Sequence, residues 1–254
     1  MNPPRHKGIE FKVWARHALF TDPLTRIGGE KCSYHLPTYE ALKGIVKSIY
    51  WKPTFIWIID EVRVMKRIRT QTKGTKPLVF GGGNDLAIYT FLADVEYQVR
   101  AHFEWNDHRL ELADDRNSGK HTDIARRMVE RGGRQDIFLG TRDCQGYVEP
   151  CRFGEEKGDY DDSGEVGYGL TFHGFDYPDE TGMNENREGK LQARFWRPTM
   201  TDGVIQFPRP EDTSRIVRKF VRNMTAKRFA QGNNLRSVEA EAVELQLEVG
   251  DGVD

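Results

Sequence analysis

The chain has 254 residues, of which 38 are basic, 39 are acidic and 37% are hydrophobic, giving a net charge of −1 at pH 7. These values are typical of one large globular domain or two small ones, and they exclude collagen-like, coiled-coil and low-complexity proteins. Three cysteines cannot form a disulfide framework, the longest apolar run is only Phe55 to Ile59, and no apolar region follows the charged N-terminus. We therefore expect a cytoplasmic protein with no membrane segment.

The first 140 residues are predicted to form a sheet covered by two helices. Residues 9–16 alternate apolar and polar side chains, which indicates a half-buried strand. Thr38 is expected to cap a helix with apolar residues at helical spacing, which Pro53 stops. The further predictions are strands at 54–69, 97–105 and 136–140, and a helix at 122–131 ended by Gly132-Gly133. The order β-α-β-β-α-β is the ferredoxin-like arrangement that RNA-recognition domains share.

The second part of the chain has shorter predicted strands, interrupted by Gly, Asp and Pro, which indicate a smaller antiparallel sheet. These strands are expected at 145–153, 167–176, 190–197 and 203–208. The fold class is therefore predicted to be α+β. The predicted units are a ferredoxin-like RNA-binding and catalytic domain (1–140), a β-rich domain (141–236) and an acidic tail (237–254). The tail holds six acids and no base, and we expect a solvated helix or a frayed end.

Charge is distributed unevenly along the chain. Residues 1–136 carry 23 bases and 17 acids, whereas residues 137–254 carry 15 bases and 22 acids. Six bases without an acid lie between Val62 and Leu78, and seven without an acid lie between Thr213 and Val238. Such stretches are typical of a polyanion partner, although a solvated surface has the same pattern.

The segment Asn117–Thr122 lies at the start of the second predicted helix, where free N–H groups attract phosphate. Lys120 adds a positive charge, and the same field favours a neutral His121 that can accept a proton. These are the groups that RNA cleavage by its own 2′-hydroxyl needs, although an ordinary polar helix start has the same composition. Tyr50 ends the first helix; a half-buried core position is its default interpretation, and packing of both helices on one sheet face permits proximity to His121.

Cofactor motifs are missing from the sequence. Gly81-Gly82-Gly83-Asn84 lacks the ending of a nucleotide-binding P-loop, and no zinc-ligand pair is present. Asp159 begins a segment similar to a calcium loop, but Leu170 occupies its twelfth position, where a glutamate is needed. We therefore expect no metal and no cofactor.

Several blocks of the sequence together resemble one protein family. They are Ala18-Leu19-Phe20-Thr21, Ser48-Ile49-Tyr50-Trp51-Lys52-Pro53, Asp115-Arg116-Asn117 with Gly119-Lys120-His121, residues 132–140, Cys144-Gln145-Gly146-Tyr147, residues 173–178 and residues 206–210. In this order, over roughly residues 9–215, the chain resembles the fifth CRISPR-associated protein family in its type I-C (Dvulg) form. Ala15-Arg16-His17 departs from the expected family pattern, which leaves His17 as a possible second proton carrier or a surface histidine.

The resemblance implies a ferredoxin-like domain followed by a β-rich domain, and an endoribonuclease that cuts precursor CRISPR RNA within each repeat, beside a hairpin. Tyr50, Lys120 and His121 match the family's catalytic residues. The protein is expected to remain on the 5′ handle and to assemble with the large and backbone subunits of the surveillance complex. The chemistry requires no metal and leaves a 2′,3′-cyclic phosphate; whether His121 acts as base or acid stays open. Basic side chains are expected to hold the RNA: Lys52, Lys66, Arg67, Arg69, Lys73, Lys76, Arg116 and Arg134.

Two other functions remain possible at this point. The first is a non-catalytic scaffold that binds the RNA handle. The second is a divalent-metal nuclease acting on DNA, for which Asp114-Asp115 is the nearby carboxylate pair.

Overall fold

The chain is described here from a computed structural model, for residues 8–78, 80–83, 85–180, 189–230 and 232–246. Its helices are α1 (Pro23–Arg26), α2 (Tyr39–Ile49), the 3₁₀ helix η2 (Asp107–Asp115), α3 (Ser118–Glu130) and α4 (Val238–Glu244). None of the described helices combines the length and the apolar character needed to cross a bilayer.

Most strands of the described chain belong to one antiparallel sheet with the order β5-β6-β1-β4-β2-β11-β10-β7, and β3 pairs with the outer end of β4. Its strands are β1 (Gly8–Ala18), β2 (Phe55–Val64), β3 (Thr70–Thr75), β4 (Ala87–Trp105), β5 (Ile137–Phe138), β6 (Gln145–Pro150), β7 (Glu165–Gly167), β10 (Thr199–Thr201) and β11 (Val204–Gln206). A second sheet contains β8 (Thr171–Asp176), β9 (Lys190–Trp196) and β12 (Val217–Asn223).

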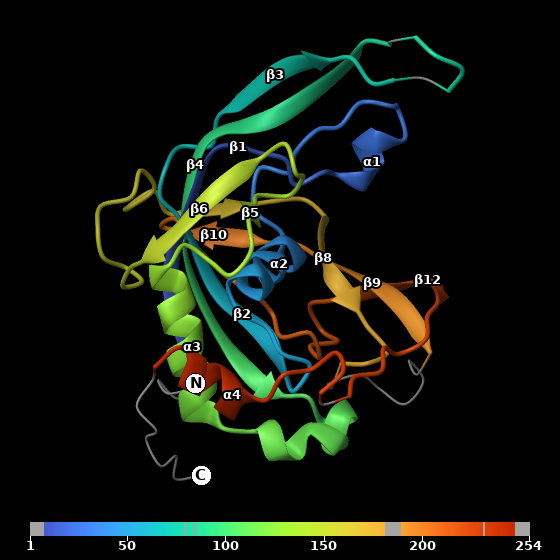
Figure 1. Cartoon of the computed structure of the whole chain (residues 1–254). Helices are drawn as coiled ribbons and strands as arrows, with labels where there is room; N and C mark the ends of the chain where they lie inside the picture. The colour runs from blue at the N-terminus through green and yellow to red at the C-terminus, as the bar shows by residue number, and fades with distance from the viewer. Residues whose placement is uncertain (1–7, 79, 84, 181–188, 231, 247–254) are drawn as a thin grey trace.

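Strand β4 spans the molecule and organises the sheet. It pairs with β1 and β2 over its inner part and with β3 over its first residues, at the upper end in Figure 1. Its other end, at Trp105, lies beside η2 and α3 (Figure 1). The two ends of β4 therefore lie in different regions of the protein.

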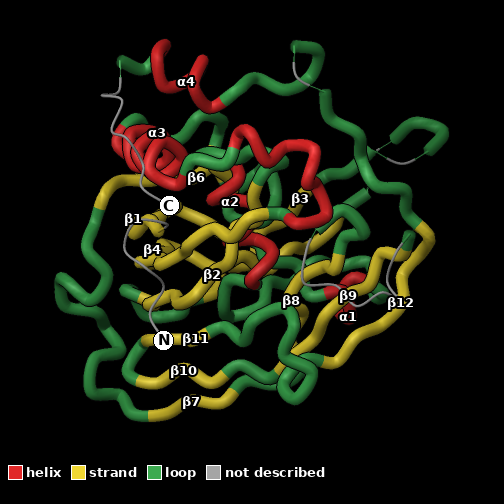
Figure 2. Tube along the Cα trace, turned by 90° about the horizontal axis from the view of Figure 1, so that it is seen from below, coloured by secondary structure: helices red, strands yellow, loops and turns green. Residues whose placement is uncertain are grey.

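Helices α2 and α3 lie on the same side of the central strands, as Figure 2 shows. Thr38 caps α2, since its hydroxyl accepts the amide hydrogen of Ala41 at 3.1 Å. The apolar face of α2 is buried, and so are alternate residues of β1. These faces form one core, in which both helices point their ends toward the Trp105 end of β4.

The helices and strands predicted for the first 140 residues are present in the predicted order, and the structure adds α1, β3 and η2 to them. Strand β4 begins at Ala87 and not at 97, and α3 begins at Ser118 and not at 122. The strand predicted at 54–69 ends at Val64, and β3 follows as a separate strand. The predicted fourth strand has two residues and pairs with β6, which separates it from β1. Backbone pairing thus continues from β1 into a strand of the second half of the chain.

The strands predicted beyond residue 140 do not form one separate sheet. Strands β6, β7, β10 and β11 join the main sheet, and the second sheet has only three strands. The predicted strand 167–176 is two strands, β7 and β8. The second sheet is attached to α2: Glu40 accepts hydrogen bonds from the Phe175 amide and the Tyr177 hydroxyl, each at 3.0 Å. The domain boundaries stay a prediction.

The acidic segment from residue 237 differs from the prediction of a solvated helix. Ser237 caps α4, and Val238, Glu241 and Ala242 are buried against the rest of the chain. Figure 1 shows α4 beside α3. Residues 247–254 of the predicted tail lie outside the described part of the chain.

Candidate active site

Tyr50 enters the core where α2 ends. Its backbone is extended (φ −159°, ψ 135°), while its amide still donates to the Val46 carbonyl at 2.9 Å. The Trp57 indole donates to the Tyr50 carbonyl at 2.7 Å. Together these bonds fix the ring below the helix end, where its exposure is 0%.

His121 lies in the first turn of α3 and is also fully buried. Asn117 caps this helix by accepting the Lys120 amide hydrogen at 3.0 Å. Three aromatic rings surround the imidazole, with centroid distances of 5.0 Å to Phe55, 6.0 Å to Phe103 and 5.8 Å to Trp105. The histidine therefore sits in an apolar pocket at the end of β4.

Tyr50 and His121 are hydrogen-bonded partners, with 2.8 Å between the phenol oxygen and Nδ1. The other ring nitrogen, Nε2, lies 2.7 Å from the backbone carbonyl of Asp115. A carbonyl only accepts, so Nε2 carries the hydrogen, and in a neutral imidazole Nδ1 must accept the hydrogen of the Tyr50 hydroxyl. The arrangement is a chain of two hydrogen bonds from Tyr50 through His121 to Asp115.

Burial keeps both side chains neutral. Loss of hydration lowers the pKa of His121 to about 4, although the Asp115 carbonyl and carboxylate act in the opposite direction. Burial likewise raises the pKa of Tyr50 above its ordinary value, with the charges of Glu241 and Asp115 adding to this effect. The sequence predicted a neutral His121 from the field of the helix; the direction is right, but burial is the main cause.

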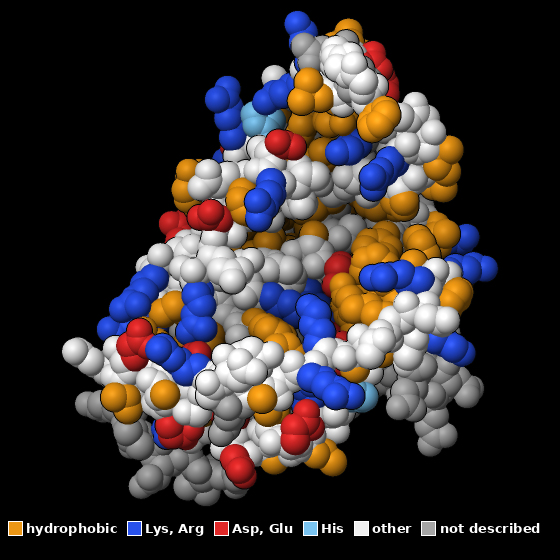
Figure 3. Space-filling model, turned by 45° about the vertical axis from the view of Figure 1, so that its right-hand side comes forward, with side chains coloured by type: hydrophobic (Ala, Val, Ile, Leu, Met, Phe, Trp, Pro, Cys, Tyr) orange, Lys and Arg blue, Asp and Glu red, His pale blue; other side chains and the backbone are white. Residues whose placement is uncertain are grey.

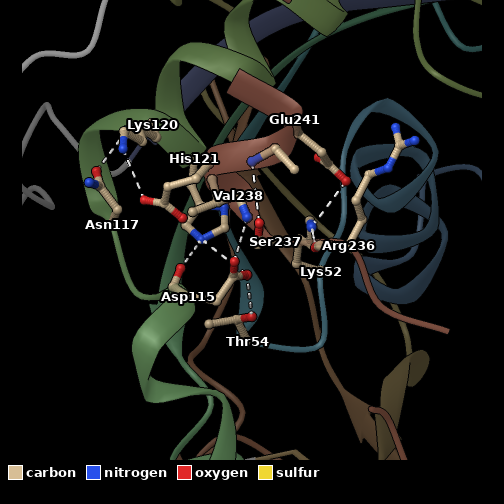
Figure 4. A network of polar contacts seen from close by, with 12 residues as sticks. Lys52, Thr54, Asp115, Asn117, Lys120, His121, Arg236, Ser237, Val238 and Glu241 are labelled. Atoms are coloured by element: carbon tan, nitrogen blue, oxygen red, sulfur yellow. Dashed lines mark hydrogen bonds and ion pairs between the residues drawn. The ribbon is translucent and has the colours of Figure 1, made fainter. Parts of the chain in front are cut away.

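Lys120 precedes His121 in the first turn of α3, but its side chain has a different partner. Its ammonium pairs with the Glu239 carboxylate of α4 at 2.9 Å, and its side chain is only 12% exposed. The three residues predicted as catalytic are therefore close together. Two of them bond directly to each other, whereas the third is neutralised by a carboxylate of α4. Figure 4 shows Lys120 and His121 beside the start of α4.

Asp115 is a site residue to which the sequence assigned no role of its own; it was noted in a block that resembles the family and as one of a carboxylate pair for a metal. Its carboxylate is buried and accepts hydrogen bonds from the Thr54 hydroxyl at 3.0 Å and the Val238 amide at 2.5 Å. Asp114 is exposed, so the two carboxylates do not share one surface. Among the residues described here, no three His, Cys, Asp or Glu side chains are grouped closely enough to hold a metal ion.

The residues predicted to bind RNA fall into two groups, and the first surrounds the site. Lys52 is buried and pairs with Glu241 at 3.0 Å. Arg134 contacts the same carboxylate at 3.0 Å and lies over the Tyr50 ring, 5.1 Å from its centroid. Arg116 pairs with Asp107 at 3.1 Å, next to Trp105.

The second group lies on β3 and on the residues that flank it on both sides. Arg67, Arg69 and Lys76 are exposed, and Lys66 and Lys73 are half-buried. Lys73 stands opposite Tyr89, sixteen residues before Trp105 on β4. Lys66 and Arg69 pair with Asp94, eleven residues before Trp105. At about 3.3 Å per residue, the group lies about 36 to 53 Å along β4 from Trp105, which packs against His121. Figure 3 shows Lys and Arg side chains both on the upper part of one face and around the hollow in its lower part.

His17 belongs to the distant end as well. Its Nε2 lies 2.8 Å from the side-chain oxygen of Gln71 on β3, and its Nδ1 lies 3.4 Å from the Lys73 ammonium. The structure thus does not bring His17 to the Tyr50–His121 pair.

Comparison with known proteins identifies the family. The family model Cas_Cas5d, described as "CRISPR-associated protein (Cas_Cas5)", matches residues 8–208. The chain belongs to this CRISPR-associated Cas5 family. The match covers the pair Tyr50 and His121 but ends well before α4.

Individual relatives agree with the family assignment. The chain is 27% identical over 147 residues to "CRISPR pre-crRNA endoribonuclease Cas5d" of Mannheimia succiniciproducens, covering 49% of this chain and 63% of the relative. A protein of the same name from Thermus thermophilus is 26% identical over 152 residues, covering 56% of this chain and 63% of the relative. The matched region therefore spans less than two thirds of these relatives. A solved structure described as a CRISPR-associated protein is 32% identical with a TM-score of 0.68, covering 83% of this chain and 96% of that one.

Proposed function

We propose that this Cas5 chain is an endoribonuclease that cleaves precursor CRISPR RNA within its repeats by attack of a ribose 2′-hydroxyl. The observation that carries the proposal is the buried hydrogen bond of 2.8 Å between Tyr50 and His121, next to Lys120. The two curated relatives bear the name of the same activity. The chemistry uses only side chains of this site and needs no metal.

In the proposed reaction, the 2′-oxygen bonds to the adjacent phosphorus and the bond from phosphorus to the 5′-oxygen breaks. One proton leaves the 2′-hydroxyl and one is delivered to the 5′-oxygen, so the products are a 2′,3′-cyclic phosphate and a free 5′-hydroxyl. Lys120 would stabilise the extra negative charge on the phosphorus oxygens. Because cleavage needs one group that accepts a proton and one that gives a proton, neutral Tyr50 and His121 together can serve both purposes.

The direction of the Tyr50–His121 bond suggests how these protons move. Tyr50 donates its hydrogen to Nδ1, so its oxygen keeps lone pairs that can accept the 2′-hydroxyl proton while the phenol hydrogen passes to His121. The imidazolium so formed would be held by the Asp115 carbonyl. Its proton would then return through Tyr50 or reach the 5′-oxygen directly.

We further propose that the first 140 residues are a ferredoxin-like domain in which β6 is inserted between the first and fourth strands. The strand order β1-β4-β2 with both helices on one side supports this interpretation. After cleavage, the protein would remain on the 5′ handle and join the large and backbone subunits of a surveillance complex. A cytoplasmic location goes with this role. The exposed basic side chains near β3 are candidates for contacts with RNA remote from the cut.

The test is cleavage of the repeat RNA from the same genome in excess EDTA by the full-length protein. We expect cleavage by the wild type, and a loss of about 100-fold or more in rate for Tyr50→Phe, Lys120→Ala and His121→Ala. A substrate with 2′-deoxyribose at the cut should be inert. His17→Ala and Tyr147→Phe are matched controls remote from the site, and they should cleave normally.

The alternatives give different results. Tight binding without cleavage would identify a handle-binding scaffold. Cleavage that begins only with added divalent metal, or that acts on DNA, would replace the proposed mechanism with a metal-dependent one.

A further inference from the structure

The candidate catalytic pair is closed to solvent in this structure. Tyr50 and His121 each have an exposure of 0%, so a phosphate of the RNA backbone cannot contact them as they stand. Any reaction at this pair requires that a covering element moves. Helix α4 and the residues before it are packed at this place (Figure 4).

Polar contacts between α4 and the site are numerous and specific. Glu239 pairs with Lys120 at 2.9 Å, and Glu241 pairs with both Lys52 and Arg134 at 3.0 Å. These two carboxylates thus neutralise three of the cations that surround the buried pair.

The backbone of the same segment completes the cover. The Val238 amide donates to the Asp115 carboxylate, and the Val238 side chain is fully buried. The carbonyl of Arg236 accepts a hydrogen bond from the Lys52 ammonium. The segment is therefore docked by its main chain as well as by its charges.

Charge and chain position both point to a competitor of RNA. A carboxylate presents anionic oxygens to Lys and Arg as a phosphate does, and residues 237–254 contain six acids and no base. The match to the family model ends at residue 208, and the covering segment lies beyond it. The contacts it makes join residues more than 100 positions apart in sequence.

We infer that α4 is a built-in competitor for the RNA, whose carboxylates of Glu239 and Glu241 occupy phosphate positions and whose displacement by RNA opens the Tyr50–His121 pair. This inference rests on the proposed function for the identity of the displacing polyanion. RNA gains the cations Lys52, Lys120 and Arg134 only as the two glutamates leave them. The measured affinity is then the intrinsic affinity multiplied by the fraction of molecules in which α4 is displaced.

Salt dependence distinguishes this exchange from simple destabilisation of the fold. In the wild-type protein the two glutamates already neutralise these cations. RNA binding therefore exchanges carboxylates for phosphates, and it does not only release counterions from the RNA. Removing both carboxylates should therefore steepen the dependence of log affinity on log salt, by up to about two in slope. A merely loosened structure would not change that slope.

The experiment compares full-length Glu239→Gln/Glu241→Gln with Glu244→Gln. Glu244 lies on the same helix and forms an exposed ion pair with Arg236. Glu244→Gln is therefore a matched control. The probe is the repeat RNA with 2′-deoxyribose at the cut, which binds without being cleaved. We expect about tenfold tighter binding and the steeper salt slope for the double variant, and affinity within twofold of wild type for the control.

Hydrogen exchange on the wild-type protein gives a second measurement that does not depend on the variant folding. The Val238 amide is buried in a hydrogen bond to Asp115 and should exchange slowly in the free protein. Addition of the 2′-deoxy RNA should accelerate its exchange, together with that of the rest of α4.

Several results would overturn the inference. They are a Val238 amide that stays protected in the RNA complex, an equal gain of affinity in Glu244→Gln, or a folded double variant that binds no RNA. Displacement of α4 by RNA in a protein that never cleaves would refute the nuclease activity alone and would still support the competitor.

Discussion

The burial of His121 has a measurable consequence for acid stability. Its pKa in the folded protein is about 4, below the 6.5 of a free histidine. Between these two values the unfolded chain binds a proton that the folded chain does not, so stability falls as pH decreases through this window. At about 1.4 kcal/mol per pH unit, the expected loss from this one side chain is about 3 kcal/mol.

The perturbation is His121→Gln, a side chain of similar shape that does not titrate. Urea unfolding of wild type and variant is measured from pH 7 to pH 4, and each free energy of unfolding is compared with its own value at pH 7. His173 is also buried with a pKa held below its ordinary value, but it is present in both proteins and cancels in the comparison.

We expect the wild type to lose about 3 kcal/mol more than the variant over this range. Parallel pH curves would refute the reasoning, since they would mean that the imidazole is already hydrated in the free protein. They would also contradict the closed state on which the competitor role of α4 depends.

Three further predictions concern other parts of the molecule. Tyr50→Phe leaves a buried imidazole nitrogen without its donor, so urea unfolding at pH 7.5 should show a loss of about 1–3 kcal/mol, and Tyr147→Phe, on the surface, should show none. Burial lowers the pKa of His102, but its hydrogen bonds to two carboxylates prevail and raise it to about 9. Its stabilising effect is thus complete below pH 6.5 and lost as pH rises through 9, and a His102→Gln variant should not show this loss of about 1–3 kcal/mol. Arg67→Ala and Lys76→Ala should each reduce the salt slope of RNA binding by about one and leave the cleavage rate at saturating RNA unchanged; an unaltered slope would remove the β3 region from the RNA interface.

Local patterns in the sequence predicted the scaffold of the site well. The Thr38 cap and the apolar spacing of α2 depend on neighbouring residues, and the structure has both. The second helix was predicted at 122–131, but the Asn117 cap starts it four residues earlier, at Ser118. Because both helices cross the same sheet face, the contact of Tyr50 with His121 followed as a possibility, and the structure confirms it.

Contacts between distant residues could not be predicted in the same way. The acidic segment has the composition of a solvated helix, and nothing in it indicates that Lys52 and Lys120, more than 100 residues earlier, will bind it. The strands beyond residue 140 are short, and their own sequence does not determine which sheet edge they join. The predicted basic residues are separated into two groups because β4 is long. Its length depends on pairing with three other strands, β1, β2 and β3, which local sequence does not reveal.

The length of β4 sets how far the β3 region lies from the end of the strand beside His121. Each residue added to or removed from its nineteen changes the separation of the β3 region from His121 by about 3.3 Å. Because side chains alternate between the faces of a strand, a change by one residue also turns one end over relative to the other. Homologues that keep both ends in use should therefore vary this strand in steps of two residues, and the spacing of the two basic groups can take only discrete values.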